Sequence, residues 1–192
     1  MKLKSLTTAA LLGAVIFSAP AQAADYVIDT KGAHASINFK IKHLGYSWLT
    51  GRFDKFNGTF SYDEKNPGAA KVSVEIDTNS VNSNHAERDK HLRGADFLEV
   101  SKFPKASFVS TKVEPDGTKK AIVHGKLTLH GVTKDIAIKV DHVGGGKDPW
   151  GGFRHGFSGT VSIALADYSI KRNLGPASKE LELSLYIEGI RK

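Results

Sequence analysis

The chain of 192 residues contains no cysteine at all. Thiol nucleophiles, thiolate metal sites and disulfide cross-links are therefore excluded. Proline is scarce, with 6 residues, whereas the 19 glycines suit a fold with many tight turns. Without cross-links, stability has to come from a hydrophobic core, and 40% hydrophobic residues in a chain of this length can form one.

Long hydrophobic runs are also lacking, except for one at the N-terminus. Residues 1–23 contain two lysines, an apolar stretch over residues 6–17 and the small-residue sequence AQA. This three-part layout is typical of a bacterial secretory signal peptide, with cleavage after Ala23. The apolar stretch is short for a membrane anchor, and no later segment reaches spanning length. We therefore expect residues 24–192 to form one soluble, exported domain.

The charge is only mildly positive. Lysine and arginine number 27 against 20 acidic residues, a formal charge of +7. Removing the two lysines of residues 1–23 leaves 25 basic residues against 20 acidic ones, or +5. Such an excess favours anionic small ligands or anionic surfaces. No dense basic run with interleaved aromatic residues is present, so nucleic acid is not an expected partner.

The dominant pattern of the chain is alternation of apolar and polar residues with a period of two. It is clear in residues 35–42, 71–77, 135–141, 157–165 and 181–188. This period predicts strands with one apolar face each. Turn sequences such as NPG, PDG and HG separate the strands. We expect an all-β fold of about eight antiparallel strands, arranged as a sandwich or a closed barrel.

The aromatic segment SWLTGRFDKFNGTFSYD, residues 47–63, changes phase in its middle. Phe53 is out of step with Phe56, whereas Phe56, Phe60 and Tyr62 keep step with one another. A slip of one residue within a strand predicts a bulge or a bend. Strands that close into a barrel need such bends. An eight-stranded barrel either is filled by its own side chains or holds one small ligand, and alternation alone leaves both open.

The segment NHAERDKHLRGADFL, residues 84–98, is the main exception to the strand pattern. We expect a short helix near residues 84–94, with Asn84 as its N-cap and Gly94 ending it in a left-handed conformation. Its charged face should point to solvent. Three apolar residues should turn inward and brace one end of the barrel: Leu92, Phe97 and Leu98.

The same segment is the most plausible place for chemistry, and it fits chemistry poorly. His85 and His91 lie six residues apart, about 240° around a helix, so they cannot share a metal ion. An enzyme acting on a lipid headgroup through Asp89 and His91, or His85, remains an alternative. However, no G-x-S-x-G sequence supplies a nucleophile. We therefore expect no catalytic residue and no metal site.

Four sequence motifs together resemble the YceI family of exported lipid-binding proteins. They are HLGYSWLTGRF, NHAERDKHLRGADFLEVSKFPKASF, LTLHGVTKDI and DYSIKRNLGP, in that order, and the resemblance covers residues 25–191. It implies an extended, lipocalin-like antiparallel β-barrel with an elongated apolar cavity. It also implies binding of a polyisoprenoid or another long-chain amphiphile, such as an isoprenoid quinone or a polyprenyl phosphate, in the periplasm of a Gram-negative bacterium. No catalytic activity and no required cofactor are implied.

The resemblance favours a cavity over a filled barrel, although a stress-related structural module with a filled barrel remains an alternative. The long-chain lipid would be the partner, with transient contact to the membrane surface or a membrane protein during delivery. From the alternation, we expect the following residues to line the cavity: Ile37, Phe39, Ile41, Trp48, Phe53, Phe56, Phe60, Phe108, Leu127, Ile138, Phe157, Ile163 and Leu183.

The basic loop YSIKRNLGPAS, residues 168–178, is either a solvated loop or a cationic mouth of the cavity. A cationic mouth would hold a phosphate or another polar headgroup through charge-assisted hydrogen bonds. The candidates for contacts with a ligand headgroup are His91, Arg93, Lys171 and Arg172.

Overall fold

The computed structural model describes residues 23–172 and 174–192. The predicted signal peptide therefore lies outside the described residues, except for Ala23. The strands are β1 (Ala24–Ile28), β2 (Ser36–His43), β3 (Ser47–Phe53), β4 (Phe56–Tyr62), β5 (Lys71–Asp77), β6 (Val81–Asn82), β7 (Lys105–Asp116), β8 (Lys120–Leu129), β9 (Val132–Lys147), β10 (Phe153–Ala164) and β11 (Glu180–Arg191). The helices are α1 (Ala86–Arg93) and the 3-10 turns η1 (Pro67–Ala69), η2 (Thr78–Ser80), η3 (Leu165–Tyr168) and η4 (Pro176–Ser178).

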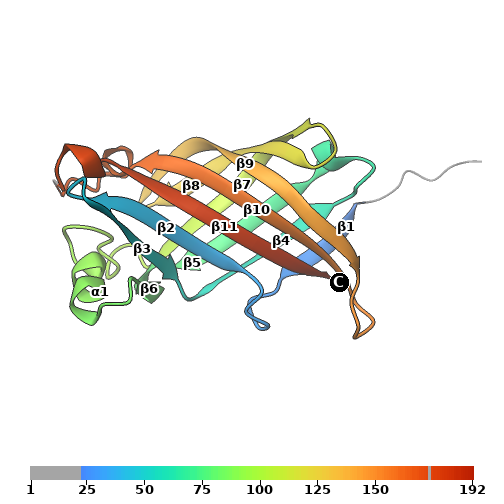
Figure 1. Cartoon of the computed structure of the whole chain (residues 1–192), viewed down its shortest axis with the longest axis horizontal. Helices are drawn as coiled ribbons and strands as arrows, with labels where there is room; N and C mark the ends of the chain where they lie inside the picture. The colour runs from blue at the N-terminus through green and yellow to red at the C-terminus, as the bar shows by residue number, and fades with distance from the viewer. Residues whose placement is uncertain (1–22, 173) are drawn as a thin grey trace, which may run out of the picture.

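The strands form one antiparallel sheet that closes into a barrel. The ring runs β1-β4-β5-β7-β8-β9-β10-β11 and closes through the pairing of β1 with β11. Figure 1 shows an elongated barrel with α1 and the turns η3 and η4 at one end, and the β9–β10 hairpin and the C-terminus at the other. The predicted eight-stranded all-β barrel with one short helix is confirmed.

Three positions around the ring are each shared by two strands: β1 with β2, β3 with β4, and β5 with β6. The C-terminal part of β11 pairs with β1, whereas residues Leu181–Tyr186 pair with β2. In the same way, β4 pairs with β1 and β3 pairs with β2. On its other side β3 forms a two-residue pairing with β6. The predicted slip in residues 47–63 falls at Asp54 and Lys55, between β3 and β4. The chain bends there, but it separates two strands with different partners rather than forming a bulge within one.

Helix α1 ends at Gly94 as predicted, but its N-cap and the conformation of Gly94 differ from the prediction. His85, not Asn84, is the N-cap, and its Nδ1 accepts a hydrogen bond from the N–H of Arg88. Asn84 has a φ of 61° in a turn in which its N–H donates to Oδ1 of Asn82, so the helix begins later. Gly94 is extended, with φ −73° and ψ 174°, rather than left-handed. The predicted N-cap and the left-handed conformation of Gly94 were therefore wrong, although the helix and its end at Gly94 are confirmed.

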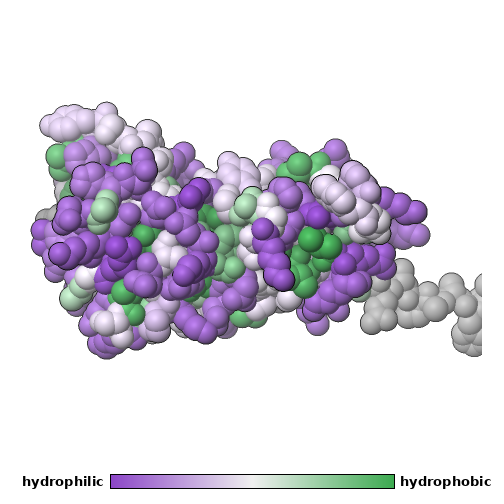
Figure 2. All heavy atoms as spheres, turned by 90° about the horizontal axis from the view of Figure 1, so that it is seen from below, coloured by the Kyte–Doolittle hydropathy of each residue, from purple (hydrophilic) through white to green (hydrophobic). Residues whose placement is uncertain are grey.

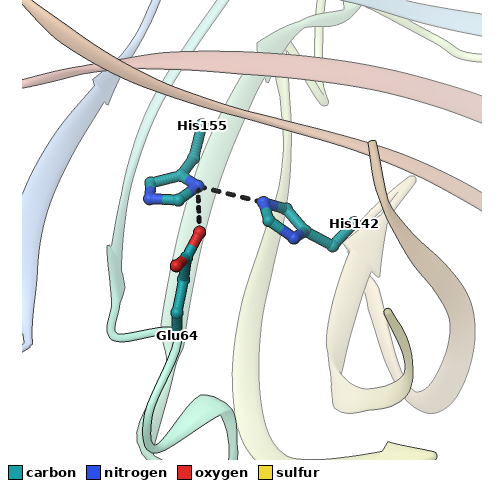
Figure 3. Close-up of side chains that lie close together, drawn as sticks. All are labelled: Glu64, His142 and His155. Atoms are coloured by element: carbon teal, nitrogen blue, oxygen red, sulfur yellow. Dashed lines mark hydrogen bonds and ion pairs between the residues drawn. The ribbon is translucent and has the colours of Figure 1, made fainter. Parts of the chain in front are cut away.

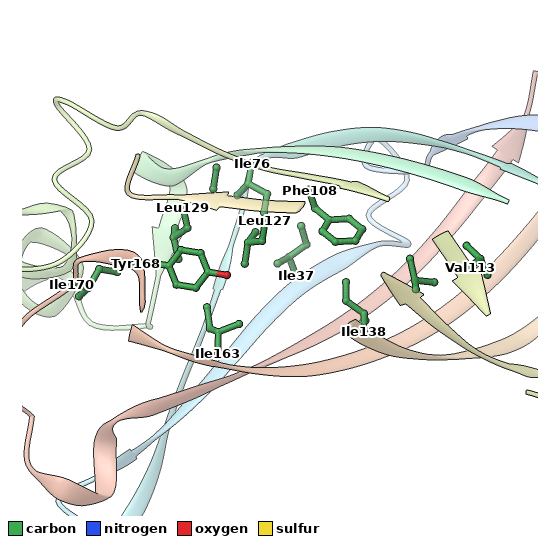
Figure 4. Packing of buried hydrophobic residues seen from close by; sticks show 12 residues of the cluster. Ile37, Ile76, Phe108, Val113, Leu127, Leu129, Ile138, Ile163, Tyr168 and Ile170 are labelled. Carbon is green, nitrogen blue, oxygen red and sulfur yellow. The ribbon is translucent and has the colours of Figure 1, made fainter. Parts of the chain in front are cut away.

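The apolar faces of the strands point into the barrel, as the alternation predicts. Figure 4 shows Ile37, Phe108, Leu127, Ile138 and Ile163 approaching the interior from different walls. A smaller cluster of Tyr26, Ile28, Phe60 and Tyr62 lies toward the other end, where the Tyr26 and Phe60 rings stack with centroids 4.8 Å apart. The outer surface in Figure 2 is mostly hydrophilic, with hydrophobic side chains in small separate groups. None of the helices among the described residues is both apolar and long enough to cross a membrane.

Candidate functional site

An elongated cavity of about 780 Å³ occupies the barrel interior. At one end its wall includes residues of α1 and of the loops around η4, and at the other it includes the β7–β8 turn around Gly117. Between these ends the wall consists almost entirely of aliphatic and aromatic side chains from the strands. The barrel is therefore not filled by its own side chains.

Most of the residues predicted to line a cavity do so. These are Ile37, Phe39, Ile41, Phe53, Phe60, Phe108, Leu127, Ile138, Phe157, Ile163 and Leu183. Leu92, Phe97 and Leu98 also reach the wall from α1 and the segment after it, as expected. The wall further includes aliphatic side chains that had not been singled out, among them Val161 and Leu185.

Two of the predicted residues, Trp48 and Phe56, do not line the cavity. The Trp48 side chain points outward from β3 and is 55% exposed, with the ammonium groups of Lys40 and Lys42 5.0 and 5.6 Å from its ring centroid. Its neighbour Leu49 takes the inward position instead. Phe56 is half-buried and packs against both hydrophobic clusters beside the break between β3 and β4.

The cavity end near α1 is cationic, but only partly through the predicted residues. His91 and Arg172 belong to the wall, and Arg172 Nη1 donates to Asp96 at 3.1 Å. Arg93 does not belong to the wall because its guanidinium turns back and donates to the carbonyl of Val81 at 3.3 Å. Lys171 also lies outside the wall, exposed on the loop after η3.

Several wall cations were not predicted. Lys42 and Arg88 lie at the α1 end, and Lys119 and Lys120 lie at the opposite end in the β7–β8 turn. No carboxylate belongs to the cavity wall as far as the described residues go. These cations come from loops far apart in the sequence, so no local pattern indicates that they share one cavity.

Asp89 serves the structure of the segment before α1. Its Oδ1 accepts hydrogen bonds from both the N–H and the hydroxyl of Ser83, and Asp89 is buried. The adjacent Arg88 donates from Nε to the hydroxyl of Ser83 and from Nη2 to its carbonyl, each at 2.7 Å. His91 instead packs its ring against Phe97. The arrangement does not bring Asp89 and His91 together as a base and its orienting partner.

Two groups of side chains among the described residues could hold a metal ion. In one, Asp29, His34 and Glu188 approach one another where β1 meets β11, but Arg154 already donates to Asp29 and Glu188 at 2.7 and 2.6 Å. Hydrogen bonds from His34 and Arg154 hold the pKa of Asp29 at about 2, well below its usual value. This group is therefore an ion-pair cluster.

The other group, Glu64, His142 and His155, lies near the far end of the cavity, whose wall includes His142 (Figure 3). His142 Nε2 lies 3.0 Å from His155 Nδ1, and His155 Nδ1 lies 3.9 Å from Glu64 Oε1. Burial, together with the neighbouring His142, lowers the pKa of His155 and favours its neutral form. The three residues are distant in sequence, so no spacing motif could have revealed them.

Comparisons with known proteins agree with this architecture. The family model of the YceI-like domain matches residues 26–189. A UPF0312 protein of Shewanella sp. strain ANA-3 is 57% identical over 189 residues, which cover 98% of this chain and 99% of the relative.

Two solved structures share the fold at lower sequence identity. The structure of BcnA from Burkholderia cenocepacia has a TM-score of 0.76 at 19% identity, covering 84% of this chain and 98% of BcnA. A polyisoprenoid binding domain from Saccharophagus degradans has a TM-score of 0.66 at 20% identity, covering 89% of this chain and all of that domain. Together with the family match over nearly the whole barrel, these findings show that the chain belongs to the YceI-like family.

Proposed function

We propose that the protein binds one long-chain isoprenoid amphiphile in its barrel and carries or stores it in the periplasm. The observation that carries this proposal is the elongated apolar cavity of about 780 Å³. Its volume lies within the range of ligand pockets, and its wall offers apolar surface rather than a set of oriented polar groups. Such a wall suits a flexible hydrocarbon tail, because each buried CH₂ group contributes about 0.8 kcal/mol without specific polar contacts.

The charge around the cavity supports a ligand with an anionic or strongly accepting headgroup. Lys42, Arg88 and Arg172 lie at the α1 end of the wall, and no carboxylate joins them among the described wall residues. A phosphate is negatively charged and offers several acceptor oxygens to such groups, whereas a quinone carbonyl is neutral and offers one oxygen. We therefore place the headgroup at the α1 end and the tail along the barrel, with a polyprenyl phosphate favoured over a quinone.

The name of the structural neighbour and the geometry of the site support a binding protein rather than an enzyme. The neighbour is a polyisoprenoid binding domain, and the present cavity has the shape that such a ligand requires. Asp89, the best acid-base candidate in the sequence, is committed to hydrogen bonds with Ser83. The periplasmic location is supported by the layout of residues 1–23.

The lipid can be identified directly. The full chain is expressed in a Gram-negative host, released from the periplasm without detergent and purified gently. Native mass spectrometry and organic extraction should reveal about one equivalent of a long-chain isoprenoid per chain. An empty protein that also rejects both quinones and prenyl phosphates in a binding assay would overturn the proposal.

We further propose that the β2–β3 hairpin contacts the membrane surface while the ligand is transferred. At the α1 end of the cavity, Leu44 is 59% exposed and Tyr46 is 88% exposed, close to the outward Trp48. Leu44 itself belongs to the cavity wall. Tyrosine and tryptophan favour the membrane–water interface, and nearby lysines such as Lys42 favour anionic lipid headgroups.

The double variant Tyr46→Ser and Trp48→Ser should slow ligand transfer to vesicles containing anionic phospholipid by roughly tenfold, because two interfacial aromatic anchors are lost. Transfer is followed with a fluorescent polyprenyl phosphate. Trp150→Ser is the matched control, because Trp150 is 76% exposed but lies on the β9–β10 hairpin at the other end of the barrel. Equal slowing by the control variant would contradict a role of the β2–β3 hairpin.

A further inference from the structure

We propose that Glu64, His142 and His155 form a binding site for a divalent transition-metal ion, with zinc as the expected occupant. The site lies at the end of the barrel opposite α1, and its His142 belongs to the wall at the far end of the cavity. Two imidazole nitrogens and one carboxylate oxygen from different segments meet there, all within 4.8 Å of one another. Two histidines and one glutamate are a common ligand set for zinc with an open fourth position.

The two histidines are already close to a coordinating geometry. With zinc–nitrogen bonds of 2.0–2.1 Å, two nitrogens of a tetrahedral site lie about 3.3 Å apart. His142 Nε2 and His155 Nδ1 lie 3.0 Å apart, so an ion between them requires them to separate by only a few tenths of an ångström. In their hydrogen bond the two nitrogens share one proton. When the metal ion binds between them, it takes the place of this proton, which is released to solvent. Figure 3 shows His142 Nε2 and the Glu64 carboxylate both approaching Nδ1 of His155.

The barrel backbone holds the histidines in this relation. His142 lies on β9 and His155 on β10, and a register shift at Val143 places His142 opposite Phe157, on the same face as His155. A bulge of this kind redirects a side chain that would otherwise point to the opposite face. Opposite His155 stands Gly145, where a Cβ atom would lie 2.1 Å from His155 Nδ1. Only glycine at this position leaves space for the coordinating nitrogen.

The ligands combine rigid and adjustable members. The His155 side chain is only 4% exposed and packs edge-on against Tyr62, with ring centroids 4.9 Å apart. Glu64 is 61% exposed, so its side chain can rotate to shorten the 3.9 Å distance to His155. A partly prepared site of this kind needs little reorganisation when the ion arrives.

The second group of potential ligands provides a useful contrast within the same barrel. At Asp29, His34 and Glu188, the guanidinium of Arg154 occupies the position that a cation would take. No arginine or lysine forms an ion pair with Glu64 among the described residues. Imidazole ligands favour zinc, copper or nickel over calcium and magnesium, which prefer all-oxygen sites. The proposal is therefore specific to one of the two groups and to one class of metal.

The test uses the untagged mature protein, stripped with a chelator and titrated with Zn²⁺ in competition with a chromogenic chelator. We expect one zinc per chain. His142→Ala should weaken binding at least a hundredfold, since the loss of even an outer partner of a metal ligand costs 10- to 100-fold. Glu64→Gln, an exposed and conservative change, should weaken it roughly tenfold. Substitution with Co²⁺ should give the visible absorption of a four- or five-coordinate site.

Two further variants separate this site from others. His34→Ala, in the group occupied by Arg154, should bind zinc like the unmodified protein. Gly145→Ala should weaken zinc binding while the barrel remains folded by circular dichroism, because the added methyl group displaces the His155 ring. The proposal is overturned if the protein binds no zinc below about 100 µM, if His142→Ala leaves the affinity unchanged, or if His34→Ala weakens binding as much as His142→Ala does.

Discussion

Replacing Val161 by tryptophan should abolish retention of a long-chain ligand while leaving the barrel folded. Val161 packs against the core from β10 but is only half-buried, so its side chain also borders the open space of the cavity. An indole there obstructs the passage along the barrel. If five methylene groups of a tail lose their burial, the binding free energy falls by about 4 kcal/mol, on the order of a thousandfold in affinity.

The control variant is Thr160→Trp, which places the same side chain one residue away on the exposed face of β10. It should bind ligand normally. Leu183→Trp, on the paired residue of β11, should repeat the effect of Val161→Trp independently. Binding is measured with a fluorescent prenyl phosphate, and folding by circular dichroism. Normal affinity in both cavity variants would show that the ligand does not occupy the barrel interior.

Arg154→Ala should cause a large loss of stability. The Arg154 guanidinium donates to Asp29, Asp148 and Glu188 at 2.6–2.8 Å. It thereby joins the segment after β1 to β10 and β11. The side chains of Asp29 and Asp148 are only 5% and 7% exposed, so the variant removes the guanidinium partner of two buried carboxylates. Breaking a buried ion pair from one side is strongly destabilising. We expect the midpoint of thermal unfolding to fall by about 10 °C.

The pH dependence of this loss identifies its cause. Because the folded-state pKa of Asp29 is about 2, below its unfolded value of about 3.9, the stability from its ionised form is complete above that unfolded value. It is lost as the pH falls toward 2. The difference between the parent and Arg154→Ala should therefore be largest near neutral pH and shrink between pH 4 and pH 2. Lys105→Ala, which removes an exposed ion pair with Glu75, should change stability little at any pH.

The sequence could predict the barrel because alternation reports the two faces of each strand. It identified Phe39 and Ile163 as inward residues, since both lie within clean alternating runs. It failed at Trp48, because alternation does not say which face is inside, and Leu49 took the inward position. It failed at the N-cap of α1, because the turn at Asn84 depends on a hydrogen bond to Asn82.

The open cavity and its cations could not be predicted from the residues alone. Whether an eight-stranded barrel is filled depends on its three-dimensional packing, and a half-buried Val161 has the same alternation as a fully packed one. Arg88 and Lys119 join the same cavity only because α1 and the β7–β8 turn lie at opposite ends of one barrel. The resemblance to the YceI family supplied the expectation of a cavity, and the structure shows it.

The short pairing between β3 and β6 has a consequence for how the barrel moves. Only Arg52 and Phe53 of β3 pair with β6, so among the described residues the edge from Ser47 to Gly51 lacks a strand on that side. The segment before α1 lies beside this edge, where Trp48, Thr50, Ser83 and Asn84 line a small pocket. Moving residues 47–51 of β3 away from the segment before α1 therefore breaks no ladder of backbone hydrogen bonds. We therefore expect a low local opening free energy, and fast amide hydrogen exchange, at this seam beside the cationic end of the cavity.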